Sequence, residues 1–151
     1  MIKYFGSADK VIVPSDVNDI NGAFAGCKDI EYITLPQRLP IIGDRTFMNC
    51  TRLKEIIIQS GLQEIGRCAF MQCQSLDHIV IPEGVTIIEE FCFYYCQNLR
   101  YIVLPSTIEQ IGSKNAEFSN FEIFDDNCIS LRHIFIPEGT KEKFKKFFSK
   151  L

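Results

Sequence analysis

Aliphatic residues recur in a fixed pattern along the chain. They occupy the first, fourth and sixth positions of a six-residue stretch, and mixed or polar residues occupy the others. Such alternation is typical of a short β-strand with one buried face. Proline closes most stretches, because it cannot donate to a continuing strand, and Gln59 takes its place once. The expected strands lie around residues 11–13, 33–35, 56–58, 79–81, 102–104 and 134–136.

Each expected strand belongs to a repeat unit of about 23 residues, and the four cysteines from Cys27 to Cys96 recur every 23 residues. A second aliphatic pair follows the strand, and then glycine at Gly43, Gly66 and Gly112, where we expect a bend that needs positive φ or close backbone approach. Asn21 and Glu89 fill that slot elsewhere. A phenylalanine then precedes a cysteine by three positions. These two columns are Phe24, Phe47, Phe70 and Phe93, and Cys27, Cys50, Cys73 and Cys96, with Cys128 further on.

One such unit is too small to bury its own apolar face, so neighbouring units must stack and share a core. From about residue 10 to 137 the pattern resembles the BspA-like leucine-rich repeat, also called the Treponema pallidum type. The resemblance implies a leucine-rich-repeat solenoid of the β-rich α/β repeat class, a right-handed coil with a parallel sheet of about six strands on its concave face. It also implies turns or short helical segments around the phenylalanines and cysteines. Most family members are bacterial surface or secreted proteins that adhere to host or matrix components.

We expect one domain over residues 1–151, with repeats over 10–137 and a cap at each end. Residues 1–9 form the N-terminal cap, in which Ile2 to Phe5 add a short strand or hairpin. Residues 138–151 form an amphipathic helix that caps the last unit, although a basic amphipathic helix can also lie on a membrane. Its apolar stripe is Phe144, Phe147, Phe148 and Leu151.

The spacing from Cys96 to Cys128 is 32 residues, nine more than the period, and the extra length falls at residues 114–122. The enlarged loop is either tolerated drift at a loop tip or a contact for a partner. Four acidic residues make the region negative, but they lack the alternating spacing of a calcium-binding loop. They are Glu117, Glu122, Asp125 and Asp126.

Composition narrows the function classes. The net charge of −3 supplies no basic field for nucleic acid. The longest apolar run, residues 91–96, is far shorter than the roughly 20 residues that span a bilayer, so we expect no membrane insertion. The first residues lack the apolar segment of a secretory signal, which allows a cytoplasmic location or removal of the signal. The localisation stays undetermined.

The seven cysteines and two histidines give no strong signal for a disulfide, a metal site or a catalytic site. Column cysteines on neighbouring units lie about 5 Å apart, which a disulfide can span, but we favour buried free thiols because the column is a core position. Cys92 and Cys96 alone are a weak zinc signal. His78 and His133 lie two strands apart, about 10 Å, too far to share a metal. We expect no cofactor, no metal and no enzymatic activity.

The outward positions of the strands form the candidate binding surface. Period-two alternation directs the third and fifth positions of each stretch to solvent, and the fifth-position column is apolar for an exposed surface. Strand propensity alone is the competing explanation. The candidate residues are Tyr32, Thr34, Glu55, Ile57, His78, Val80, Arg100, Tyr101, Val103, Arg132, His133 and Phe135.

Two function classes follow from these features. The leading one is a non-catalytic module that binds a protein or peptide on its concave sheet, as a monomer or weak homo-oligomer. The alternative is a self-assembling structural subunit that pairs through the apolar strip or the solenoid ends.

Overall fold

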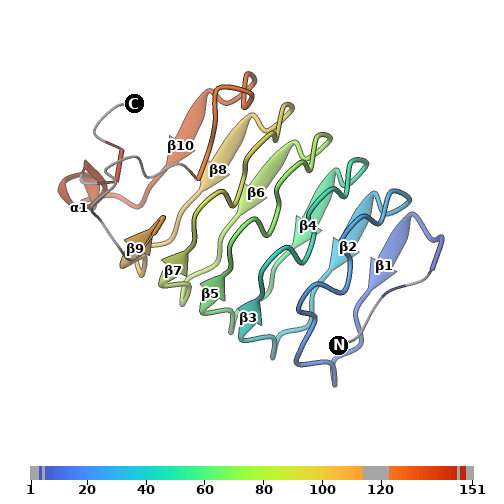
Figure 1. Cartoon of the computed structure of the whole chain (residues 1–151). Coiled ribbons are helices and arrows are strands. Elements are labelled where there is room, and N and C mark those ends of the chain that lie inside the picture. Colours follow the sequence, from blue (N-terminus) through green and yellow to red (C-terminus); the bar gives the residue numbers. More distant parts are fainter. Residues whose placement is uncertain (1–3, 5, 114–122, 146, 149–151) are drawn as a thin grey trace.

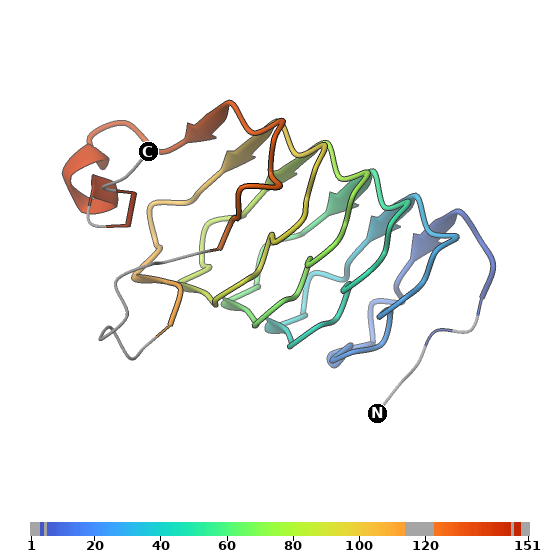
Figure 2. The same ribbon diagram turned by 45° about the horizontal axis from the view of Figure 1, so that its top comes forward.

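The chain folds as a solenoid in which six parallel strands lie side by side along one face (Figures 1 and 2). The computed structural model describes residues 4, 6–113, 123–145 and 147–148. The strands pair in two blocks, β1-β2-β4 and β6-β8-β10, always with the same repeat positions opposite each other. They are β1 (Lys10–Ile12), β2 (Tyr32–Thr34), β4 (Glu55–Ile57), β6 (His78–Val80), β8 (Tyr101–Val103) and β10 (His133–Phe135).

A second parallel sheet, which the sequence did not predict, runs along the opposite side of each unit. Its order is β3-β5-β7-β9. The aliphatic pairs were recognised, but a strand of two residues is too short to show a period of two. Register places Ile42, Ile65 and Ile88 in one buried column. The strands are β3 (Ile41–Ile42), β5 (Glu64–Ile65), β7 (Ile87–Ile88) and β9 (Gln110–Ile111).

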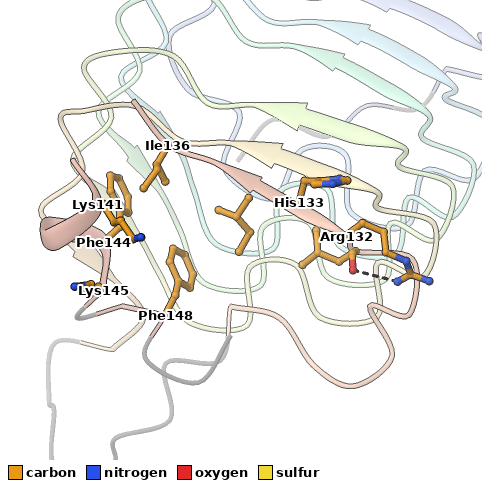
Figure 3. Close-up of a pocket in the computed structure, with 9 residues that line it drawn as sticks. Arg132, His133, Ile136, Lys141, Phe144, Lys145 and Phe148 are labelled. Carbon is orange, nitrogen blue, oxygen red and sulfur yellow. Dashed lines mark hydrogen bonds between the residues drawn. The ribbon is translucent and has the colours of Figure 1, made fainter. Parts of the chain in front are cut away.

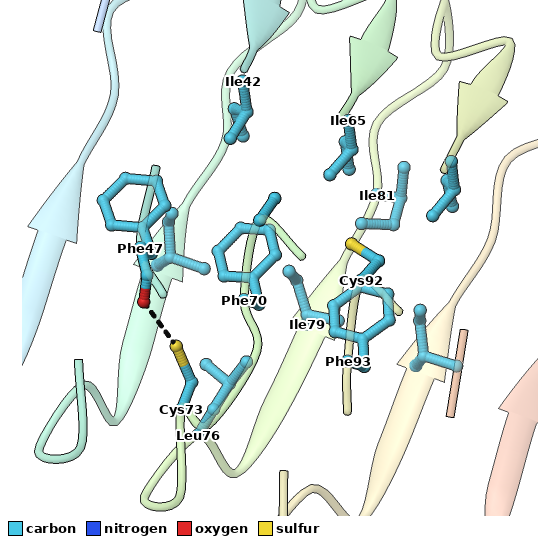
Figure 4. Packing of buried hydrophobic residues seen from close by; sticks show 14 of the residues in the cluster. Ile42, Phe47, Ile65, Phe70, Cys73, Leu76, Ile79, Ile81, Cys92 and Phe93 are labelled. Atoms are coloured by element: carbon cyan, nitrogen blue, oxygen red, sulfur yellow. Dashed lines mark hydrogen bonds between the residues drawn. The ribbon is translucent and has the colours of Figure 1, made fainter. Parts of the chain in front are cut away.

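A ladder of aromatic rings runs through the core between the two sheets (Figure 4). The rings of Phe24, Phe47, Phe70 and Phe93 stack with successive centroid distances of 5.2, 5.3 and 5.6 Å. Phe124 continues the ladder at 5.7 Å from Phe93. At the other end Tyr4 lies 5.5 Å from Phe24 and donates its N–H to Ala23, so its ring covers the first unit. Tyr4 lies in no strand, and the rest of the expected segment, including Ile2 and Phe5, lies outside the described residues.

The cysteine column holds the same stack through hydrogen bonds. The thiol of Cys73 donates to the carbonyl of Phe47 in the preceding unit at 3.2 Å, and that carbonyl also accepts the N–H of Cys50 at 3.1 Å. Cys50, Cys96 and Cys128 repeat the thiol contact at 3.1 to 3.2 Å. All seven cysteines are free, and all but the half-buried Cys27 are buried. The predicted buried free thiols are therefore confirmed, with Cys27 the partial exception.

Two residues per unit take left-handed backbone conformations in the turns beside the ladder. One series is Gly22, Arg45, Cys68 and Phe91, and the other is Gly26, Asn49, Gln72 and Tyr95. The glycines singled out from the sequence serve differently. Gly112 has a φ of 84°, whereas Gly43 and Gly66 have no positive φ and are needed for close approach. A Cβ on Gly66 would lie 2.8 Å from the main-chain nitrogen of Asp44.

A small helix is present at the C-terminal end, as predicted, but it is shorter than residues 138–151. α1 spans Lys141–Lys145, and the N–H of Phe144 donates to the carbonyl of Thr140. Phe144 is buried, and Phe147 and Phe148 pack on the core. Leu151 and the enlarged loop at 114–122 lie outside the described residues.

Replacing the central ring tests the ladder. We expect Phe70→Ala to lower the free energy of unfolding by about 3–5 kcal/mol, because it removes a fully buried ring that contacts two others. Urea denaturation followed by circular dichroism measures the change. Ile129→Ala is the matched control at an exposed position and should shift stability by less than about 0.5 kcal/mol. Equal effects from the two variants would contradict the role of the ladder.

Thiol reactivity tests the cysteine column. Burial raises the pKa of Cys50 to about 12 and that of Cys128 to about 11, so both carry almost no reactive thiolate at pH 8. We expect iodoacetamide to label Cys27 first in the folded protein and to leave Cys50 and Cys96 unmodified until urea unfolds the chain. Mass spectrometry of tryptic peptides follows each site. Rapid labelling of Cys50 in the native protein would refute this packing.

Candidate functional site

The structure places the candidate residues on the outward face of the six strands. Their side chains project from the third and fifth positions of neighbouring strands, with Arg100 and Arg132 beside them. Ile57, Val80 and Phe135 are 50%, 51% and 50% exposed, whereas Thr34 and Val103 are half-buried. We call the fifth-position column the apolar strip.

The strip is longer than the sequence analysis stated, because β1 contributes Ile12. This side chain is 81% exposed and pairs in register with Thr34. The sequence predicts a strand over residues 11–13, but the predicted fifth-position column begins only at Thr34. The same alternation that located the other members contains the signal for this one. The apolar strip consists of Ile12, Thr34, Ile57, Val80, Val103 and Phe135.

An aromatic cluster lies beside the C-terminal half of the strip. His78 and His133 both pair in register with Tyr101, so they lie two strands apart as predicted. The rings of His78 and Tyr101 stack at 5.0 Å, and Phe135 contacts Tyr101 edge-on at 5.7 Å. His133 stacks on Phe135 at 5.7 Å. Because these rings contact one another, they form a continuous aromatic surface across β6, β8 and β10.

Two ion pairs between second-position side chains of neighbouring strands form a charged border on this face. Arg100 donates to both carboxylate oxygens of Asp77, at 2.6 and 2.7 Å, and holds the pKa of Asp77 below its ordinary value. Lys54 donates to Glu31 at 2.6 Å and, with Arg52, lowers the pKa of Glu31. These exposed pairs position side chains more than they stabilise the fold.

A further cationic feature lies at the N-terminal end of the face. The ammonium groups of Lys10 and Lys54 lie 5.4 and 6.0 Å from the centroid of the Tyr32 ring. A cation at this distance from an aromatic face is attracted by the ring quadrupole. The face therefore has a cationic end around Tyr32 and an aromatic end around Tyr101.

The same residues offer little for catalysis or metal binding. His78 Nδ1 lies 3.2 Å from Asp77 Oδ2, but that carboxylate is also held by Arg100. Over the part of the chain that the structure describes, no three His, Cys, Asp or Glu side chains gather in a way that could hold a metal ion. Among those residues there is also no helix with the length and hydropathy needed to cross a membrane.

Comparison with solved structures finds the same architecture elsewhere. The T. pallidum leucine rich repeat protein superposes with a TM-score of 0.74 at 24% identity, over 99% of this chain and 87% of that one. A leucine-rich repeat protein from Bacteroides ovatus is 36% identical with a TM-score of 0.68, over 83% of this chain. A leucine rich cell surface protein from Faecalibacterium prausnitzii is 28% identical with a TM-score of 0.68, over 89% of this chain.

The chain corresponds to only part of the latter two proteins, 30% of the Bacteroides chain and 37% of the Faecalibacterium chain. A search against curated protein sequences gives no match. A family model for the BspA type leucine rich repeat region matches residues 17–151 with six copies of the repeat. Those copies and the in-register stacking of their strands show that the chain belongs to the BspA type leucine rich repeat family.

Proposed function

We propose that the chain is a non-catalytic module that binds a protein or peptide on the apolar strip and its aromatic border. The observation that carries this proposal is the exposure of Ile12, Ile57, Val80 and Phe135 at the same repeat position, in register within β1-β2-β4 and within β6-β8-β10. A single exposed aliphatic is ordinary, but a contiguous exposed patch marks an interaction site. Tyrosine and arginine beside the patch are residues that often carry binding energy.

Strand propensity alone explains the strip less well. The second sheet is subject to the same preference for β-branched residues, yet its outward column reads Ile41, Glu64, Ile87 and Gln110. Half of those positions are polar, so an outward column in this fold does not have to be apolar. This difference between the outward columns of the two sheets supports the proposal that the apolar strip contacts a partner.

The finer proposal is that this binding serves adhesion at a bacterial surface. It is supported by similarity to the Faecalibacterium protein, which is described as a cell surface protein, at 28% identity. The family resemblance found in the sequence points the same way. On this proposal the partner is a host or matrix protein that meets the strip.

The alternative proposal is a self-assembling subunit in which the strip of one copy packs on that of another. An isologous pair of this kind places the same surface on both copies. Self-assembly is supported by the same exposed column. It differs from the first proposal only in that the partner is a second copy of the chain.

Charge placed in the strip tests the binding proposal. We expect Val80→Glu combined with Phe135→Glu to reduce capture of the partner from bacterial lysate or host extracellular extract at least about tenfold, because both side chains would be desolvated in the complex. Quantitative mass spectrometry compares the variants, and circular dichroism verifies the fold. Ile41→Glu, at a residue 44% exposed on the second sheet, is the control.

Light scattering on the purified chain separates the two proposals. A monomer in the wild type, together with a protein captured by the wild type and lost only in the strip variant, supports heterologous binding. A dimer that the strip variant abolishes supports self-assembly. Identical capture by all three proteins would refute the strip as the binding surface.

A further inference from the structure

The last unit is less completely covered than the units before it. Leu131, Ile134 and Ile136 are half-buried, whereas the equivalent Leu99, Ile102 and Leu104 are fully buried by the next unit. α1 covers only part of this surface. A groove of 430 Å³ remains between β10 and α1 (Figure 3).

The groove has an apolar floor and a cationic border. Its apolar lining comes from Leu131, Ile134 and Ile136 on one side and from Phe144 and Phe148 on the other. Arg132, Lys141 and Lys145 lie at its margins. The position of the groove is that of a missing seventh strand, so its apolar floor is the surface on which the aliphatic side chains of such a strand would pack.

The main chain of β10 presents the hydrogen-bonding groups that such a strand needs. Along the array the second-position N–H donates to the second-position carbonyl of the preceding unit, as Arg100 does to Asp77 and Arg132 to Arg100. The carbonyl of Arg132 is next in this series. Within the described residues this carbonyl has no main-chain partner, which leaves an unpaired sheet edge.

A second series of hydrogen bonds runs in the opposite direction. The sixth-position N–H donates to the fifth-position carbonyl of the following unit, as Ile81 does to Val103 and Leu104 to Phe135. The N–H of Ile136 is next, and in the described part of the chain it too lacks a main-chain partner. An added strand can therefore be held by one acceptor and one donor that the fold has already positioned.

The charged side chains at the second position favour an added strand that carries an acidic residue there. Second-position side chains pair across neighbouring units, Glu31 with Lys54 and Asp77 with Arg100. Arg132 is the last member, and its guanidinium donates instead to the carbonyls of its own turn, at Ile129 and Leu131. A carboxylate at the second position of an added strand would lie on the strand next to Arg132 and carry the charge opposite to that of its guanidinium.

We propose that this groove binds one extended peptide segment as a parallel strand on β10, with an acidic residue at its second position and aliphatic residues at its fourth and sixth. This mode is β-augmentation, in which main-chain hydrogen bonds give affinity and alternate side chains give specificity. α1 forms the far wall of the groove, opposite β10. The site lies at the edge of the sheet, whereas the apolar strip lies on its outward face, and Phe135 is the only strip member on β10.

The chain itself supplies a probe of matching pattern. Residues 8–14 read Ala-Asp-Lys-Val-Ile-Val-Pro, with Asp9 at the second position and Val11 and Val13 at the fourth and sixth. We expect a fluorescein-labelled peptide ADKVIVP to bind the full chain saturably in fluorescence anisotropy. Peptide AKKVIVP should bind about fivefold more weakly, because it removes the ion pair with Arg132.

Two controls separate strand addition from nonspecific apolar binding. Arg132→Glu, at an exposed position, should reverse the preference between the two peptides. N-methylation of the aspartate in ADKVIVP should abolish binding, because it removes the N–H that pairs with the Arg132 carbonyl. Hydrogen exchange should show slower exchange at the Ile136 amide when the unmodified peptide is bound.

The outcomes are decisive in both directions. A reversed preference, together with protection of Ile136, supports the proposal. Absence of saturable binding, or equal affinity of the N-methylated peptide, overturns it. Displacement of the peptide by decanoate, a ligand with a simple apolar chain, also overturns it if the bound peptide does not protect the Ile136 amide. The single strip variant Val80→Glu, on β6 and two strands away from β10, should bind ADKVIVP as the wild type does, so failure at the strip and failure at the groove are distinguishable.

Discussion

Each repeat unit depends on the next one for its hydrophobic core. The clearest expression is the contact between phenylalanines of neighbouring units, whose rings stack at 5.2 to 5.6 Å from Phe24 to Phe93. A unit of this size cannot bury these rings by itself. The thiol hydrogen bonds of the cysteine column join the same neighbouring units. The ring contacts and these hydrogen bonds therefore set one distance between units, which both sheets share.

The turns tolerate unfavourable backbone conformations because the same neighbours satisfy their main-chain groups. The left-handed Asn49 and Gln72 donate their N–H groups to Met71 and Tyr94 of the following unit. A left-handed conformation at a residue other than glycine costs about 1–3 kcal/mol, which must be offset by such contacts. At Tyr95 the acceptor is the side chain of Asp125, which replaces a main-chain carbonyl where the chain returns after residues 114–122.

The sequence alone predicted most of what depends on the period. The six strands, the phenylalanine and cysteine columns and the register of His78 with His133 all follow from counting positions. The second sheet did not, since two-residue strands such as Ile41–Ile42 carry no alternation, and Ile12 was missed because its column was begun one unit late. The groove beside β10 could not be predicted, because it depends on how much of the last unit a five-residue helix covers.

The border of charges has a consequence for how such arrays can change in length. Along the second position the signs run Glu31, Lys54, Asp77 and Arg100, and the pairs form across neighbouring units. Loss of the single unit containing Lys54 would place Glu31 next to Asp77, two like charges on adjacent strands. Loss of two consecutive units would restore opposite charges at the junction. A change of two units therefore keeps the alternation of charge between Glu31 and Arg100, whereas a change of one unit keeps only the core pattern.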